Sequence, residues 1–335
     1  MHKVKAFKTE SEVEIMTDFF TEKTPFAADK VGFAIYHFGQ AGVDAFGNMG
    51  DNTFAYHGYD REQCDYQESL GYMNYYSYRL HPEQYMHLRR TRAMGATNWM
   101  HYFPFVKVEL LNGTTTFMPK PGWKEEITKI VEDAKKAGLW DSIAGFHFDE
   151  PLLHTDGETF EEFSKFLSQF GKRQFGVFSI YEIKAGSHPR SSDPEFGMTA
   201  HLINPSNTQY LTDIGYDWYH DADYDAYKAY NELMLNDIQR DNIYVWGFPT
   251  TWTARNPNFN EDLCIRNLEM HRKLLDDCRY PGGLYCYTWR SWHEGLKNGL
   301  DHYFDTNNPD RWNRLEAKMI EIGKELGQIK LKPLK

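Results

Sequence analysis

Short apolar runs alternate with longer amphipathic stretches along most of this chain. The apolar runs have the length and composition of buried β-strands. Seven strands are predicted, over residues 31–39, 97–104, 143–150, 175–183, 212–219, 242–249 and 283–289. An eighth is expected near residues 72–78. The amphipathic stretches have apolar residues at helical spacing. They predict helices over residues 82–95, 123–138, 159–170, 224–240, 261–278 and 311–326.

This alternation predicts the fold class. Strands that alternate with helices imply parallel strands joined by crossover helices, so we expect an α/β protein with a (β/α)8 TIM barrel. No repeat or domain boundary is evident, and one catalytic domain is predicted over residues 1–335. The alternative is an open doubly wound sheet, but no glycine-rich phosphate turn follows the first strand. Residues 39–80 and 184–206 predict long loops on the catalytic face.

The predicted strand over residues 143–150 ends at two adjacent carboxylates and a proline, in the run GFHFDEP. Alternate residues of a strand face opposite sides. We therefore expect His147 and Asp149 inside the barrel, and Phe146 and Phe148 under the surrounding helices. Glu150 follows at the strand end, where the chain turns over the site.

Catalytic residues of barrel enzymes gather at the C-terminal ends of strands, so Asp149 and Glu150 are the catalytic candidates. The competing interpretation is that one of these acids only caps the next helix, with proline at its start. The clear helical pattern begins only near Thr159, however, and Thr155 or Asp156 is the better cap.

The charge balance disfavours some classes of partner. The formal net charge of the 335 residues is −11, with 48 acidic and 37 basic residues and no basic block. Nucleic acid is therefore not an expected partner. The four cysteines form no CxxC pair, which excludes a zinc-ribbon pattern and a disulfide scaffold.

The chain has no strongly apolar segment near its start or elsewhere. Residues 1–30 lack the apolar core of a signal peptide, and no apolar run has the length of a membrane span. We expect no membrane partner. A cytoplasmic location is predicted, or a secreted one if a leader peptide has been removed.

The two acids and the aromatic content together suggest carbohydrate chemistry. Glycoside cleavage needs a carboxylic acid to protonate the leaving oxygen and a second group at the anomeric carbon. Neighbouring like charges help to keep one carboxyl group protonated. Aromatics make up 16% of the chain, which suits either a site that stacks sugar faces or an aromatic-rich core. We predict a glycoside hydrolase that acts on a carbohydrate and needs no cofactor or metal.

Other polar and aromatic residues at or beyond strand ends are candidates for substrate binding. They are His37, His101, His147, Glu182, Asp217, Tyr219, Trp252, Tyr287, Trp289, Trp292 and Glu294. Each has a plain structural alternative: a solvated or salt-bridged carboxylate, a hydrogen-bonded histidine, or a tryptophan that only packs in the core.

A strand that ends in Asp149-Glu150-Pro151 resembles the catalytic strand of β-N-acetylhexosaminidases, particularly of glycoside hydrolase families 20 and 123. The late aromatic strand over residues 283–289 is also similar in character to the one that closes such pockets. The resemblance implies substrate assistance, in which the 2-acetamido oxygen of the sugar attacks its own anomeric carbon. It implies that Asp149 orients the acetamido group and that Glu150 is general acid, then base.

Three alternatives stay open. A conventional two-carboxylate glycosidase would use Glu150 as the acid and Glu182, Asp217 or Glu294 as its partner. A metal-dependent hydrolase would need three or four close donors, and the chain has neither HExxH nor an HxH after the first strand. A carbohydrate-binding barrel without catalysis would keep the aromatic site and need no acid.

Overall fold

The computed structural model describes the barrel strands and the helices around them. The described residues are 29–35, 71–78, 85–101, 105–109, 115–183, 201–219, 222–251, 253–254, 260–287, 297–298 and 313–335. Every structural statement below refers to these ranges.

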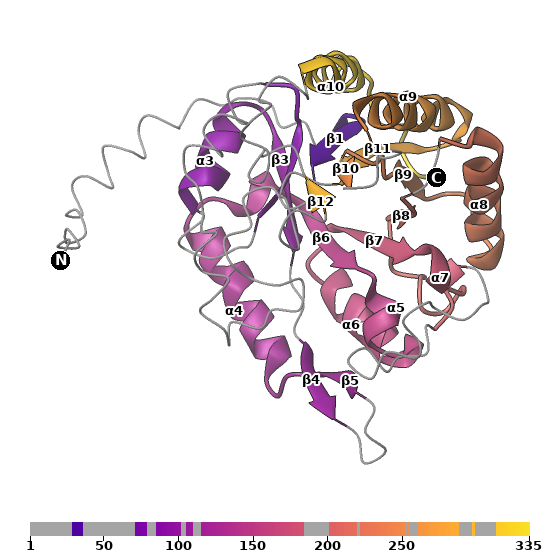
Figure 1. Ribbon diagram of the computed structural model, residues 1–335. Helices are drawn as coiled ribbons and strands as arrows, with labels where there is room; N and C mark the ends of the chain where they lie inside the picture. Colours follow the sequence, from indigo (N-terminus) through magenta and orange to yellow (C-terminus); the bar gives the residue numbers. More distant parts are fainter. Residues whose placement is uncertain are drawn as a thin grey trace, which may run out of the picture.

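Eight parallel strands form one sheet that curves into a barrel, as predicted (Figure 1). The strands are β1 (Gly32–Ile35), β2 (Tyr75–Tyr78), β3 (Thr97–His101), β6 (Ile143–Asp149), β7 (Arg173–Ser179), β8 (Asp213–Asp217), β9 (Tyr244–Gly247) and β11 (Pro281–Cys286). Their order in the sheet is β1-β11-β9-β8-β7-β6-β3-β2. Strand β2 is the eighth strand that was expected near residues 72–78. The fold is a (β/α)8 TIM barrel.

Helices surround the strands, and the six predicted ones are all present (Figure 1). They are α3 (Tyr85–Ala93), α4 (Trp123–Lys136), α6 (Gly157–Ser168), α8 (Tyr224–Asp237), α9 (Glu261–Asp277) and α10 (Asn313–Leu326). The Asp156 side chain caps α6 by accepting a hydrogen bond from the Thr159 amide at 2.7 Å. None of the described helices combines the length and apolar character needed to cross a bilayer.

Several short elements differ from the sequence prediction, and residues 180–183, predicted as the end of the strand over 175–183, form a short helix instead. These elements are the one-turn helices α5 (Pro151–His154) and α7 (Ile180–Ile183) and the 3-10 turn η4 (Trp140–Ser142). Two small antiparallel pairs are also present, β4 (Phe105–Glu109) with β5 (Thr115–Pro119) and β10 (Thr253–Ala254) with β12 (Lys297–Asn298). Elements of two to five residues are too short to show a periodic pattern. Helices α5 and α7 directly follow β6 and β7, so they shape the ends of those two strands.

The side chains of β6 confirm the predicted alternation. Phe146 and Phe148 lie outside the barrel, and Phe148 packs edge-on against two phenylalanines of α6. His147 is buried inside, with ring centroids 5.3 Å from both Phe175 and Tyr285. The strand is therefore covered by apolar packing on both faces, as expected for a strand of a parallel barrel.

The barrel interior is filled mostly by aromatic rings. The larger members of this inner cluster are Tyr75, Trp99, Phe175, Tyr244, Trp246, Phe248, Tyr280 and Tyr285. A Cβ atom at Gly32 would lie 2.2 Å from the Trp246 ring, so only glycine leaves room for the indole at that point of β1. Much of the aromatic excess noted in the sequence therefore belongs to the core.

The two edge strands of the sheet meet through Asn74, which directly precedes β2. Its side chain accepts a hydrogen bond from the Phe33 amide at 2.7 Å and donates one to the Val31 carbonyl at 2.9 Å. Its own amide donates to the Phe33 carbonyl at 3.2 Å. One asparagine thus joins β1 to β2 and draws the barrel closed.

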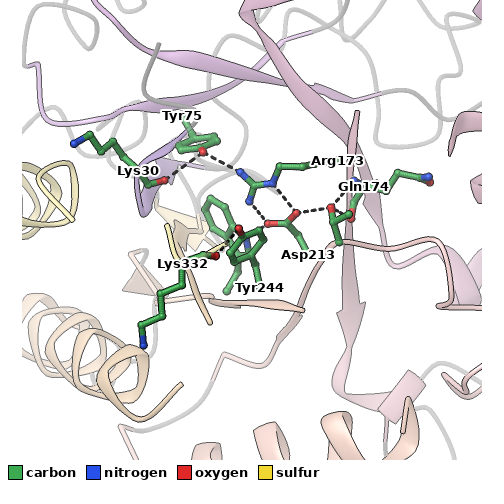
Figure 2. A network of polar contacts seen from close by, with 9 residues as sticks. Lys30, Tyr75, Arg173, Gln174, Asp213, Tyr244 and Lys332 are labelled. Carbon is green, nitrogen blue, oxygen red and sulfur yellow. Dashed lines mark hydrogen bonds and ion pairs between the residues drawn. The ribbon is translucent and has the colours of Figure 1, made fainter. Parts of the chain in front are cut away.

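A buried ion pair fills the barrel at the N-terminal ends of the strands (Figure 2). The Arg173 guanidinium binds both carboxylate oxygens of Asp213, with Nε to Oδ2 at 2.9 Å. Arg173 also donates to the Tyr75 hydroxyl at 3.0 Å, and the Trp246 indole donates to Asp213 at 2.8 Å. Burial alone would lower the pKa of Arg173, but the charges of Asp213 and Tyr75 and the hydrogen bonds to them together outweigh burial and raise that pKa.

The C-terminal segment crosses this end of the barrel. The Leu331 amide donates to the Asp29 carbonyl at 2.8 Å, and the Tyr244 hydroxyl donates to the Lys332 carbonyl at 2.8 Å. Leu331 and Leu334 pack against the inner aromatic cluster. This end is therefore closed by packing, which leaves the opposite end for a binding site.

Replacing Asp213 by asparagine should strongly destabilise the protein, because it leaves the Arg173 charge buried without its counter-ion. We expect the free energy of unfolding to fall by roughly 3 kcal/mol, measured by urea denaturation. Asp241→Asn is the control, since it removes the exposed pair with Arg279 and should cost less than about 1 kcal/mol. Equal losses in the two variants would contradict a stabilising role for the buried pair.

Candidate active site

The candidate site lies at the C-terminal ends of the barrel strands, here called the barrel mouth. Asp149 is the last residue of β6 and is paired in register with Val177 of β7. Because His147 faces the interior, the strand period of two turns Asp149 inward as well. The Asp149 residue is half-buried, as expected for a group at the boundary between core and solvent.

Glu150 interrupts the strand period. Its backbone has φ 42° and ψ 49°, in the left-handed region, which costs a residue with a side chain about 1–2 kcal/mol. The Glu150 amide donates to the Val177 carbonyl at 2.8 Å, and Pro151 begins α5 at once. Strained backbone of this kind is typical of functional sites.

The geometry of α5 tests whether one of these acids caps the following helix. Glu150 does occupy the N-cap position of α5, but its side chain makes no capping hydrogen bond. Residues that cap with their side chains normally have extended backbone, whereas Glu150 is left-handed. The turn therefore does not use the Glu150 carboxylate to cap its own helix.

Glu182 lies beneath the mouth and is fully buried. Its Oε1 accepts hydrogen bonds from the amides of Leu152 at 2.6 Å and Leu153 at 3.1 Å, and its Oε2 accepts one from the Ser179 amide. Burial raises the pKa of Glu182 well above its usual range, these amide bonds oppose the rise, and the charges of Asp217 and Asp149 add to it. This burial places Glu182 behind the site surface rather than on it.

Two residues of the mouth follow β8, which lies next to β7 in the barrel. Asp217 ends β8 in register with Ser179 of β7, and it is half-buried. Tyr219 comes two residues later and stacks on Tyr287, with ring centroids 4.7 Å apart and planes inclined by 25°. Tyr287 follows β11 and is held there by the Thr251 amide, which donates to its carbonyl at 2.6 Å.

The pKa of Tyr219 depends on burial and on the charges of the neighbouring acids. Burial raises the pKa of the Tyr219 hydroxyl well above its usual value, and the charges of Asp217, Asp149 and Glu150 raise it further. The phenol therefore stays protonated through the physiological range and can donate a hydrogen bond. The structure thus brings Asp149, Glu150, Asp217, Tyr219 and Tyr287 into one electrostatically coupled cluster at the barrel mouth.

The remaining candidates from the sequence cannot be placed in this cluster. His37, Trp252, Trp289, Trp292 and Glu294 lie outside the described residues. His101 is described only through its backbone, which pairs with His147 between β3 and β6. His147 itself lies deeper in the barrel than the acids, among aromatic rings. These residues stay predictions.

The sequence reasoning missed the role of Ser179. Ser179-Ile180-Tyr181-Glu182 has the spacing of a capping box, in which an acid three residues into a helix bonds back to the preceding amide. The structure shows that bond at the start of α7. The motif was readable from the sequence, but the second half of the Glu182 interaction, with α5, was not.

Among the described side chains, no group of three or more His, Cys, Asp and Glu residues is arranged to hold a metal ion. What the described cluster offers is carboxylate and phenol chemistry: proton donation, proton acceptance and the stabilisation of positive charge. The prediction of a metal-free reaction stays a prediction.

Comparison with known proteins supports the fold alone. No protein-family model matches the sequence, and no curated protein matches it either. A candidate α-L-fucosidase from Bacteroides thetaiotaomicron has a similar structure, with a TM-score of 0.50 at 11% identity over 96% of this chain and 100% of that one.

Two further structures are similar over part of their length. One is Bacteroides uniformis β-glucuronidase 2 bound covalently to cyclophellitol-6-carboxylate aziridine, with a TM-score of 0.47 at 10% identity over 81% of this chain. This chain spans only 33% of that protein. The other is a family 17 β-1,3-glucanosyltransferase from Rhizomucor miehei, with a TM-score of 0.47 at 10% identity over 72% of this chain and 86% of that one.

Replacing Asp217 by asparagine should lower the pKa of Tyr219, because a neighbouring negative charge that opposes phenolate formation is removed. The measurement is a pH titration of the tyrosine ring carbons by NMR, with Tyr219→Phe used to assign the resonance. Asp225→Asn, in the first turn of α8, is the control and should leave the titration unchanged. An identical Tyr219 titration in Asp217→Asn would show that the two groups do not interact.

Proposed function

We propose that this chain is a glycoside hydrolase and that the barrel mouth is its active site. Glu150 is the general acid and base, and Asp149 is its stabilising partner. The observation that carries this proposal is the pair of adjacent carboxylates at the end of β6, with Glu150 in a left-handed turn that breaks the strand alternation. Such strand ends are where barrel enzymes place their catalytic residues.

The local chemistry supports acid catalysis. Negative charges close to a carboxyl group favour its protonated form, and a general acid must carry a proton to give to the leaving oxygen. The protonated Tyr219 hydroxyl supplies a hydrogen-bond donor beside these acids, and the Tyr219–Tyr287 stack supplies a flat aromatic surface. Both features suit a ligand that has hydroxyl groups around an apolar ring face.

The substrate class we propose is a hexosaminide within a glycan. In this mechanism Asp149 orients the 2-acetamido group, whose carbonyl oxygen attacks the anomeric carbon as the glycosidic bond breaks. Glu150 gives its proton to the leaving oxygen and then takes one from the water that opens the cyclic intermediate. The adjacency of Asp149 and Glu150 in one strand end supports this route, since both must face one sugar ring.

A conventional mechanism is the second candidate, favoured by the position of Asp217. This carboxylate ends β8, and its charge acts on Tyr219 and Glu182 as that of Asp149 does. In this scheme Glu150 is again the acid, and Asp217 acts on the anomeric carbon directly or through water. The two mechanisms therefore differ in the second carboxylate and in the need for an acetamido group.

Replacing Glu150 by glutamine should lower kcat by roughly 10²–10⁴-fold, the usual contribution of a general acid, while sugar binding is retained. Turnover of aryl glycosides and calorimetric titration of the product sugar measure the two effects. Glu158→Gln, an exposed change on α6, is the control. Undiminished turnover in Glu150→Gln would exclude the acid role, and sugar binding without turnover in the wild type would identify a binding barrel instead.

Aryl glycosides with and without a 2-acetamido group separate the two mechanisms. Substrate assistance predicts that an N-acetylhexosaminide is cleaved and that the matching glucoside or galactoside is cleaved very poorly. Thiazoline analogues should then inhibit, because they resemble the cyclic intermediate. Equal turnover of both substrates, together with loss of activity in Asp217→Asn, would favour the conventional mechanism.

A further inference from the structure

The Glu182 carboxylate connects two turns of the barrel mouth that lie on neighbouring strands. One of its oxygens binds the amides of Leu152 and Leu153 in α5, which follows β6. The other binds the Ser179 amide at the end of β7. These partners are main-chain donors, and the side chain is fully buried, so Glu182 is held in place from both sides.

The two amides in α5 are the ones that a capping side chain would use. Pro151 is the first residue of this helix and has no amide hydrogen, so Leu152 and Leu153 are its second and third residues. A capping side chain accepts hydrogen bonds from these two positions. Glu150 occupies the capping position, yet its side chain makes no such bond, and Glu182 supplies the acceptor in its place.

We propose that Glu182 is a positioning residue of this site: by binding the α5 amides and the Ser179 amide together, it fixes the left-handed turn that carries Glu150, and so keeps the Glu150 carboxylate at the barrel mouth. This inference rests on the proposed function, because Glu150 must act on a substrate for its position to affect turnover.

The positioning role of Glu182 comes from its hydrogen bonds and not from a charge. Burial, with the charges of Asp217 and Asp149, raises the pKa of Glu182 well above its usual range, which favours the neutral carboxyl group. A neutral carboxyl group keeps acceptor oxygens for main-chain amides, so the bridge between α5 and Ser179 does not depend on ionisation.

Two variants test the positioning role. Glu182→Ala removes both acceptor oxygens, so the amides of α5 and Ser179 lose their common partner and the turn that carries Glu150 is no longer fixed. Glu182→Gln keeps one acceptor oxygen for Leu152 and Leu153. Asp156→Ala is the matched control, because it removes a capping carboxylate from α6, in the same stretch of chain but on the exposed outer side of the barrel.

The experiment measures kcat and KM on the best aryl glycoside, with melting temperatures to compare stability. We expect kcat to fall roughly 10²-fold in Glu182→Ala, the effect of a misplaced catalytic group, with KM little changed. Glu182→Gln should lie between this variant and the wild type, because it keeps one acceptor oxygen for the α5 amides. Asp156→Ala should change only the melting temperature.

Kinetics like those of Asp156→Ala in both Glu182 variants would overturn the inference. If Glu182→Ala does not fold, wild-type kcat in Glu182→Gln has the same meaning. If the wild type cleaves no glycoside, the proposed function fails, and amide hydrogen exchange decides the inference. Faster exchange at Leu152 and Leu153 in the Glu182 variants than in Asp156→Ala would support the bridge, and unchanged exchange would overturn it.

Discussion

The parallel closure of eight strands is the constraint on which the rest of this structure depends. A closed parallel barrel sends all strand C-termini to one mouth, so residues far apart in sequence become neighbours there. It also leaves a tube that side chains must fill. Here Trp99, Phe175, Trp246 and Tyr285 fill it, and Asn74 joins the two edge strands. The proposed site therefore lies above a barrel interior that is packed with aromatic side chains.

Charged groups are paired at one end of the barrel and clustered with like charges at the other. At the N-terminal ends of the strands, the Arg173 charge is neutralised by Asp213, and tyrosine and tryptophan groups complete the hydrogen bonds. At the mouth, Asp149, Glu150 and Asp217 act together on one tyrosine. Like charges close together destabilise a fold, and perturbed pKa values in such clusters are typical of functional sites. The ion pair at the N-terminal ends of the strands has a structural role, whereas the acidic cluster at the barrel mouth suits chemistry.

Backbone geometry and a buried carboxyl group act together where β6 ends. The left-handed conformation of Glu150 is unfavourable on its own, and the turn is held by the bond of its amide to the Val177 carbonyl and by the Glu182 carboxylate. A strained residue persists only where its surroundings over-determine it. The neighbouring strand β7, together with the short helix after it, supplies these constraints.

The sequence by itself determined the local features of this protein. Periodicity predicted the eight strands and six long helices, the inward His147, the outward Phe146 and Phe148, and the position of two acids at a strand end. Only the tertiary structure decided which residues meet. Glu182 binds amides about thirty residues away in the chain. Arg173 forms an ion pair with Asp213, forty residues later, and Tyr219 stacks on Tyr287. Periodicity depends on neighbours in the chain, whereas these pairings depend on the register of strands closed into a barrel, which no local pattern encodes.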